Sequence, residues 1–370
     1  NSRRDFLKAA GGSAAILGLS QAGLSSRAWA AGSDKPEIDE ISVGFIPLTD
    51  CASTVIAAVK GFDKKYGIRI KLSKEASWAA VRDKMLNGEL HASHLLYGLV
   101  YGLHMGVGGS KTDMAVLAGL NHNGQAITLA KALNAKGVVD GPSLSKHINS
   151  DSHTLTFAHT FPTGTHAMWL NYWLAAHGIN PLKAVKNIVV PPPQMVANMR
   201  VGAMDGYCVG EPWNARAIAD GIGFTVVTTQ EVWPDHPEKV LAARSDFVQK
   251  YPNAARALVA AVIEAGRYID RVEHKSEVAQ IIADKSYVNA PLDVIKGRFL
   301  GSYDNGIGKH WDDKHAMKFY DEGQVGFPYL SDGMWFLTQL KRWGFLQTHP
   351  DYLAVAKQVN RIDLYRQAAE

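Results

Sequence analysis

The chain has 370 residues, of which 46% are hydrophobic, 9% aromatic and 20% charged. This apolar content excludes a disordered chain. Lys and Arg exceed Asp and Glu by 39 − 35 = 4 charges, but residues 1–30 supply 4 − 1 = 3 of that excess. The rest of the chain is nearly neutral and lacks the strong basic patch of nucleic-acid-binding proteins. At roughly 100–200 residues per domain, the length predicts about two domains.

The first 30 residues have the order of an export signal. A basic start, SRRDFLK at residues 2–8, precedes an uncharged stretch at 9–26 and the small-x-small segment 28–30. We expect cleavage after Ala30. A membrane anchor is the alternative, but Gly, Ser and Gln dilute the uncharged stretch. The paired arginines resemble the twin-arginine signal, which is read by a dedicated export machinery, and they predict a soluble protein in the periplasm.

Predicted strands and helices alternate from residue 41 onward, which is typical of an α/β sheet. The first strands are expected near 41–47, 68–72, 94–96 and 114–117. Helices are expected at 54–60 and 77–86, and Ser77 is a plausible N-cap of the second one.

The alternation begins again in a second α/β unit at about 128–237. Strands are expected near 154–158, 188–190 and 206–209, and a helix at 165–176 is apolar almost all round. From Pro252 to about residue 345 the apolar spacing is mostly helical, and we expect this part to fold back on the first lobe.

Common catalytic and metal-binding motifs are incomplete in this sequence. A Gly-x-Ser-x-Gly elbow is missing, and the Gly-rich run at 106–112 departs from the phosphate-loop pattern. The pair His91-x-x-His94 and the polar cluster at 312–315 lack further ligands at structural-site spacing. We therefore expect no catalytic residue, no metal and no cofactor.

Five polar residues instead stand beside turn residues, at strand ends and helix starts, where an α/β cleft would form. Taken singly they are weak signals, because a tryptophan at a helix start more often packs in a core and a lysine is more often solvated. These residues are Trp78, Gln125, His166, Glu211 and Lys239.

The segments that contain them are more specific when read together. In chain order they are 46–51 (IPLTDC), 72–78 (LSKEASW), 123–129 (NGQAITL), 161–166 (FPTGTH), 204–214 (MDGYCVGEPWN) and 236–239 (HPEK). This ordered set resembles the nitrate-binding proteins of bacterial ABC transporters, a family that also contains bicarbonate-binding members and cytoplasmic nitrate/nitrite sensors. The resemblance covers about residues 41–345.

The resemblance implies an α/β, two-lobed periplasmic-binding-protein fold of type II, with a helical C-terminal extension on lobe 1. Lobe 1 is expected at 31–127 and 238–370, and lobe 2 at 128–237, with the anion held between them. Cys51 and Cys208 would then lie on different lobes, so we expect free, buried thiols rather than a disulfide that clamps the hinge.

The resemblance also assigns the ligand-binding residues. In nitrate binders the residues that match Trp78, Gln125, His166 and Lys239 line the pocket, with Gly210-Glu211 beside it. One departure is Thr163, where relatives more usually carry glycine.

The chemistry of nitrate agrees with these residue types. Nitrate is a planar monoanion that only accepts hydrogen bonds, so its site should offer N–H donors such as those of Trp78, Gln125, His166 and Lys239. Bicarbonate carries an O–H that needs an acceptor, and the bicarbonate relatives use a carboxylate and calcium where this chain has Lys239. The lysine therefore favours nitrate or nitrite. Glu211 leaves an alternative open, because its carboxylate would either accept from a ligand hydroxyl or tether Lys239.

The resemblance thus implies a receptor, not an enzyme, which captures nitrate and also nitrite and delivers it to an ABC permease driven by a separate ATPase. A bicarbonate receptor of the same family is one alternative. A nitrate/nitrite sensor that signals to a regulatory partner in the cytoplasm is another, and the export signal disfavours it.

Overall fold

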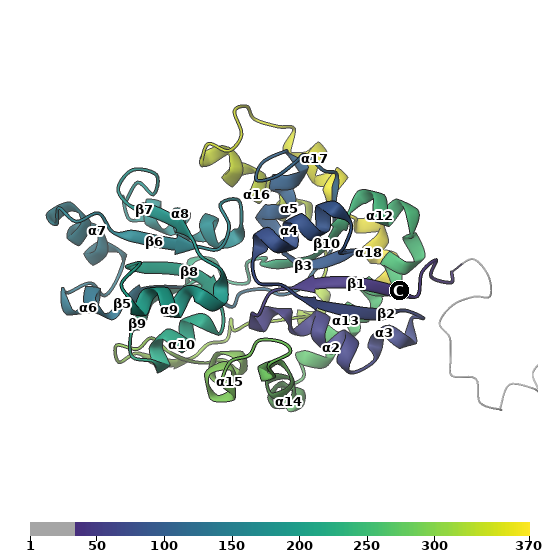
Figure 1. The fold of residues 1–370 in the computed structure, drawn as a ribbon, viewed down its shortest axis with the longest axis horizontal. Coiled ribbons are helices and arrows are strands. Elements are labelled where there is room, and N and C mark those ends of the chain that lie inside the picture. The colour runs from purple at the N-terminus through teal and green to yellow at the C-terminus, as the bar shows by residue number, and fades with distance from the viewer. Residues whose placement is uncertain (1–33) are drawn as a thin grey trace, which may run out of the picture. The chain divides into compact units, whose positions relative to one another are not determined.

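Two five-stranded sheets organise the part of the chain that the computed structural model describes, residues 34–370 (Figure 1). The chain divides into a short unit, Asn1–Lys35, and a large unit, Pro36–Glu370, and the description below concerns the large unit. The expected export signal at residues 1–30 lies outside the described residues. Within 34–370, no helix is both long and apolar enough to span a bilayer.

The first sheet consists of β1 (Glu40–Phe45), β2 (Arg69–Lys74), β3 (Ala92–Leu96), β4 (Met114–Gly119) and β10 (Lys239–Arg244). Its strand order is β2-β1-β3-β10-β4. The β1 strand pairs in parallel with β2 and β3, whereas β10 is antiparallel to both β3 and β4. Every residue of β3 is buried, as expected for a strand that is covered on both faces.

The second sheet consists of β5 (Gln125–Ala130), β6 (Thr156–His159), β7 (Lys186–Val189), β8 (Gly206–Gly210) and β9 (Gly223–Thr228). Its order, β7-β6-β8-β5-β9, repeats the order of the first sheet, with an antiparallel strand inserted beside the third parallel one. In both sheets the inserted strand, β5 or β10, enters directly from a connection between the sheets.

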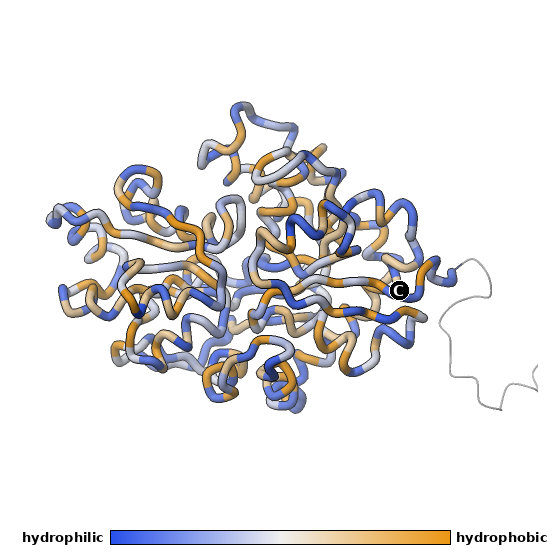
Figure 2. Tube along the Cα trace, in the orientation of Figure 1, coloured by the Kyte–Doolittle hydropathy of each residue, from blue (hydrophilic) through white to orange (hydrophobic). Residues whose placement is uncertain are grey.

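Helices cover both sheets, and the outer helices and loops carry most of the hydrophilic residues (Figure 2). Those between β1 and β10 are η1 (Thr49–Cys51), α2 (Ala52–Val59), α3 (Phe62–Lys65), α4 (Trp78–Asn87), α5 (Tyr97–His104), α6 (Lys131–Ala135), α7 (Gly141–Ser150), α8 (Thr165–Ala176), η2 (Pro192–Gln194), α9 (Met195–Arg200), α10 (Trp213–Ala219) and α11 (Thr229–Val232).

The chain after β10 is mainly helical. Its helices are α12 (Ser245–Lys250), α13 (Pro252–Ile269), α14 (Val272–Ala283), α15 (Leu292–Leu300), η3 (Asp321–Gly323), α16 (Leu330–Arg342), α17 (Tyr352–Val359) and α18 (Ile362–Ala369). A small hairpin, β11 (Ser302–Asp304) and β12 (His310–Asp312), interrupts them. Because α13 packs on α2 and α16 packs on α5, these two helices cover the first sheet, as expected for a helical extension on lobe 1, whereas α15 packs on α10 beside the second sheet.

Two connections between the sheets lie side by side. The first, residues 120–124, runs from β4 to β5, and the second, 233–238, runs from α11 to β10. They form an antiparallel bridge between His122 and Pro237, and the backbone N–H of Glu238 donates to the carbonyl of Asn121 at 3.2 Å. As a result Gln125 and Lys239, which follow the two connections directly, start strands of different sheets, β5 and β10, on opposite sides of the crossing.

Most predicted elements are confirmed to within a few residues. The helix expected at 165–176 is α8, and the Ser77 hydroxyl caps α4 by accepting the backbone N–H of Ala80 at 3.1 Å. The inserted strands β5 and β10 were not among the predicted strands. The sheet assignment places residues 125–127 with the second sheet, and the expected lobe boundaries at 127/128 and 237/238 stay a prediction.

Both cysteines are free, buried thiols, as expected. Cys51 belongs to η1, which follows β1, and Cys208 lies in the centre of β8 in the other sheet. Burial is the main cause that raises the pKa of each thiol, so both stay protonated at neutral pH.

Candidate functional site

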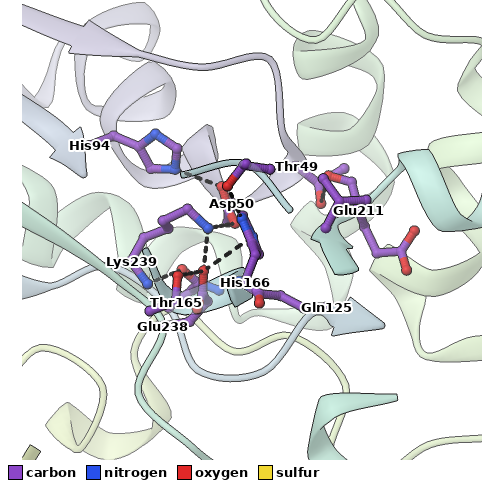
Figure 3. Close-up of polar contacts among 12 residues, drawn as sticks. Thr49, Asp50, His94, Gln125, Thr165, His166, Glu211, Glu238 and Lys239 are labelled. Carbon is purple, nitrogen blue, oxygen red and sulfur yellow. Dashed lines mark hydrogen bonds and ion pairs between the residues drawn. The ribbon is translucent and has the colours of Figure 1, made fainter. Parts of the chain in front are cut away.

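Lys239 is the centre of a buried cluster of charges (Figure 3). It opens β10, and its side chain is fully buried. The ammonium donates to Oδ2 of Asp50 at 2.9 Å and also contacts Oε1 of Glu238. Burial lowers the pKa of the amine, but the two carboxylates outweigh it and the pKa is raised. The lysine is therefore charged.

Asp50 accepts a hydrogen bond from this lysine and belongs to the segment that follows the first strand of the first sheet. It lies in η1, and both of its oxygens are bonded, Oδ2 to Lys239 and Oδ1 to Nε2 of His94 at 2.6 Å. Burial raises the pKa of Asp50, whereas Lys239 and His94 lower it, and the net result is a pKa well below its ordinary value. Asp50 is thus a permanent carboxylate at the pH of the cell.

Glu238 is the second carboxyl group beside the ammonium. Its Oε1 accepts from the Thr165 hydroxyl at 3.3 Å and lies 3.8 Å from Nε2 of His166, at the start of α8. Its Oε2 is buried and has no hydrogen-bond partner. Burial raises its pKa to about 7, and only part of this is offset by Lys239.

Buried donors without partners surround the cluster. Nε1 of Trp78, Nε2 of Gln125 and Nε2 of His166 are all shielded from solvent, and none of them has a hydrogen-bond partner. Leaving such groups unpaired costs about 1–3 kcal/mol each, so these three donors are candidates for binding a ligand that supplies acceptors. The Lys239 ammonium lies 5.8 Å from the centre of the Trp78 ring, which places the first of these donors beside the cluster.

The hydrogen-bonding state of His166 is set by Thr160. The Thr160 hydroxyl lies 2.5 Å from Nδ1 of the ring. Burial lowers the pKa of His166 well below its ordinary value, so the ring is neutral and carries one proton. When the hydroxyl donates to Nδ1, that proton is on Nε2, the atom that faces Glu238 and has no partner.

The predicted residue Gly210 also belongs to this neighbourhood. It ends β8, where it pairs with Gln125 of β5. A Cβ atom at Gly210 would lie 3.3 Å from Oδ2 of Asp50, so the bare backbone lets the two lobes approach here. This pairing brings Gln125 to the carboxylate that holds Lys239.

Glu211 takes a different role from the one that its position suggested. Its Oε1 accepts from Nη1 of Arg298 at 2.6 Å, and its carboxylate is directed away from Lys239 (Figure 3). Only its main chain reaches the cluster side, where the carbonyl accepts the backbone N–H of Thr49 at 2.8 Å. Among the described residues, the groups that tether Lys239 are Asp50 and Glu238 instead of Glu211.

Thr163 is packed between the lobes. It is 1% exposed, and a Cβ at Gly98 or Gly102 on α5 would lie 2.3 Å from its carbonyl oxygen or 2.9 Å from its Oγ1. The two glycines therefore form a notch on α5 that receives the 161–165 loop. Beside this contact, a cavity of about 610 Å³ lies next to Ser77 and Thr160, the neighbours of Trp78 and His166.

Sequence reasoning missed three members of the cluster, Asp50, His94 and Glu238. Two of them stand inside the quoted segments 46–51 and 236–239, and their charge was the available signal. The histidine pair His91 and His94 is split between two roles, because His91 accepts the backbone N–H of Ser42 while His94 contacts Asp50. Within residues 34–370, no group of three or more His, Cys, Asp or Glu side chains is arranged to hold a metal ion.

Several known proteins are similar to this chain over most of its length. A model of the NMT1-like family matches residues 34–283. Nitrate/nitrite binding protein NrtA of Synechocystis is 40% identical over 92% of this chain and 78% of the relative. Its crystal structure, described as the periplasmic nitrate-binding protein, superposes with a TM-score of 0.87 and covers 90% of this chain and 89% of that one. Bicarbonate-binding protein CmpA of Synechococcus elongatus is 33% identical, over 92% of this chain and 80% of the relative.

Proposed function

The chain belongs to the NMT1-like family, together with the nitrate/nitrite binding proteins, and on that premise we propose that it is a periplasmic receptor for nitrate and nitrite. It binds the anion between its two sheets and delivers it to an ABC permease that a separate ATPase drives. Its role is capture and delivery, without chemical change of the ligand.

The observation that carries the proposal is the set of buried donors around one cation. The N–H groups of Trp78, Gln125 and His166 have no hydrogen-bond partner. The Trp78 ring lies 5.8 Å from the Lys239 ammonium, His166 lies 3.8 Å from Glu238, and Gln125 lies beside them in Figure 3. A small planar monoanion with three acceptor oxygens satisfies all of them at once. The α8 helix adds to this field, because its first N–H groups follow Gly164 without a side-chain cap.

The lysine and the sequence identities favour nitrate over bicarbonate. Asp50 cannot accept from a bicarbonate hydroxyl because both of its oxygens are already bonded, although Oε2 of Glu238 and Oε1 of Gln125 remain buried acceptors without a partner. A calcium ion would have to lie beside the Lys239 ammonium, which repels it. The 40% identity to NrtA against 33% to CmpA points in the same direction.

The proposed location and partners follow from the relatives and from the leader. The related crystal structure is that of a periplasmic protein. The twin-arginine pattern at residues 2–8 would direct export of the chain, with cleavage after Ala30. In the periplasm the loaded receptor would dock on the permease, with the ATPase on the opposite side of the membrane.

Calorimetry of the mature protein tests this proposal. Nitrate, nitrite, bicarbonate with and without calcium, sulfate and cyanate are titrated at about pH 6.5, close to the ordinary pKa of histidine. Nitrate is expected to bind with 1:1 stoichiometry, and nitrite to compete with it. Binding of bicarbonate with calcium in the absence of nitrate binding would overturn the proposal.

A further inference from the structure

The buried cluster contains more acid than base. Lys239 is its one cation among the described residues, whereas Asp50 and Glu238 both lie against its ammonium, and all three are at most 1% exposed. The cluster is therefore negative whenever both carboxyl groups are ionised. A monoanion that enters beside Lys239 would make the local charge more negative still, in a place where water screens little.

The other titratable groups that face the cluster do not correct this imbalance. On β3, α8, β6 and the 233–238 connection, burial lowers the pKa of each imidazole and keeps it neutral, and on β8 burial raises the pKa of the thiol. The groups concerned are His94, His166, His159, His236 and Cys208. Tyr97, His122 and Asp332 line a small cavity with Glu238 and Lys239. Burial keeps the tyrosine and the histidine neutral and raises the pKa of Asp332 to about 7, so this side of the cluster adds an acid and no cation. One of the two carboxyl groups must therefore supply the compensation.

Geometry selects Glu238. Both oxygens of Asp50 are committed, to His94 and to Lys239. Glu238 uses only Oε1, which contacts Lys239 and Thr165, while its Oε2 is buried and has no partner. A proton on Oε2 would remove the excess charge without breaking any of these contacts.

We propose that Glu238 takes up one proton from solvent when the anion binds, so that the receptor binds nitrate and a proton together. The proton forms an O–H bond on Oε2, and no bond of nitrate is made or broken. This inference rests on the proposed function. The raised pKa of Glu238, about 7 in the ligand-free protein, supports it, because a nearby second anion raises that pKa further.

The consequence is a pH-dependent affinity with a defined slope. Below about pH 6 Glu238 is already protonated, and the dissociation constant is expected to be constant. Above about pH 8 each bound anion requires one proton, so the dissociation constant is expected to rise about tenfold per pH unit. Nitrate has no proton to exchange in this range.

Calorimetry in buffers of different ionisation enthalpy tests the uptake directly in the unmodified protein. At about pH 8 the observed binding enthalpy is expected to change with the buffer, with a slope of about one proton taken up per nitrate. A slope of zero overturns the inference. Nitrate binding at about pH 6 separates the two proposals: if it is present and the slope is zero, only the inference fails, whereas its absence contradicts the proposed function.

A variant assigns the proton to Glu238. Glu238→Gln replaces the carboxyl group with a neutral group of the same shape, and its affinity for nitrate is expected to lose the tenfold-per-unit dependence above about pH 8. The control is Glu273→Gln, the same substitution on the exposed surface of α14, which should keep that dependence. If Glu238→Gln keeps it too, Glu238 is not the group that takes up the proton. If the variant does not fold, the buffer experiment still decides.

Discussion

The ammonium of Lys239 lies 2.9 Å from Oδ2 of Asp50, although the two residues are 189 positions apart in the chain. Lys239 opens a strand of the first sheet, and Asp50 lies in the short helix that follows β1. The carboxylate fixes the position of the cation, and the unpaired donors of Trp78, Gln125 and His166 determine what that cation can hold. The affinity of a nearly neutral protein for an anion then depends on a few buried groups.

Reversing the charge of Lys239 should abolish nitrate binding. Lys239→Glu places a third carboxyl group beside Asp50 and Glu238, whereas Lys239→Met removes the charge-assisted hydrogen bond to nitrate and leaves the two carboxyl groups without their cation. That bond is worth about 1.5–3 kcal/mol, so Lys239→Met is expected to weaken nitrate by about 10- to 100-fold. Calorimetry measures both, after circular dichroism has confirmed folding. The control, Lys146→Glu on the exposed side of α7, should bind like the unmodified protein; an equal loss there would contradict a local effect.

Trp78→Phe should weaken nitrate without unfolding the protein. The ring packing is kept, but the Nε1 donor is lost, and one neutral hydrogen bond corresponds to about 0.5–1.5 kcal/mol. Trp169→Phe is the matched control, since its Nε1 is also buried and unpaired but its ring packs on Trp335 instead of lying beside Lys239. Fluorescence titration with nitrate should show a loss of affinity in Trp78→Phe alone. Equal effects of both substitutions would show that the Trp78 indole does not bind nitrate.

Stability of the ligand-free protein should fall as the pH falls from about 6.5 to about 4. Burial lowers the pKa of His122 and His159 to about 4 and of His236 to about 3. The unfolded chain therefore binds more protons in this window, and each such group removes about 1.4 kcal/mol per pH unit. Glu238 and Asp332 act in the opposite direction, because burial raises the pKa of each to about 7 and the folded state binds a proton on each as the pH falls through about 7, and together they offset about two histidines. The depressed pKa values of His94 and His166 add to the loss.

Urea unfolding at about pH 6.5 and about pH 5 measures this loss. His159→Gln should reduce the loss of stability by the contribution of one histidine, because burial alone lowers the pKa of that imidazole. Equal stability at the two pH values would show that these histidines are not buried in the neutral form.

Arg298→Met should destabilise the fold far more than it weakens nitrate. It leaves the Glu211 carboxylate buried without its partner, at a cost of about 3–5 kcal/mol. The double variant with Glu211→Gln should recover part of that stability, because no buried charge is then left unpaired. Thermal unfolding and calorimetry are measured on the same samples. A loss of nitrate affinity as large as that of Lys239→Met would restore the expectation that Glu211 acts on the ligand.

Local patterns were sufficient to predict most strands and helices of this chain. The α8 helix is apolar nearly all round and is preceded by Gly164, and its predicted bounds of 165–176 are those observed. The β10 strand lies between β3 and β4 and is buried on both faces. Its sequence, KVLAAR, therefore lacks the polar and apolar alternation of a half-buried strand, and for this reason it was not predicted. The two sheets share one strand order, but no repeat of fixed length in the sequence accompanies it, so this similarity was not predicted either.

The sequence was sufficient to predict the hydrogen-bond donors of the candidate site, but not the charged groups that contact them. Trp78, Gln125, His166 and Lys239 stand in the family segments, at strand and helix starts. Their charge partners depend on long-range packing: Asp50 meets His94 across 44 positions, and Glu211 meets Arg298 across 87. A carboxyl group in a motif does not show whether it faces a ligand, a lysine or an arginine, and this is why both a ligand hydroxyl and Lys239 were open as partners of Glu211, whereas its partner is Arg298.

A crystal structure of the protein grown with nitrate tests the central claim most directly. The anion is expected beside Lys239, with its oxygens within about 3.2 Å of the Lys239 ammonium and of the unpaired nitrogens of Trp78, Gln125 and His166. Each of those buried donors then has an acceptor. Nitrate bound elsewhere, with these nitrogens still unpaired or bonded only to water, would contradict the account.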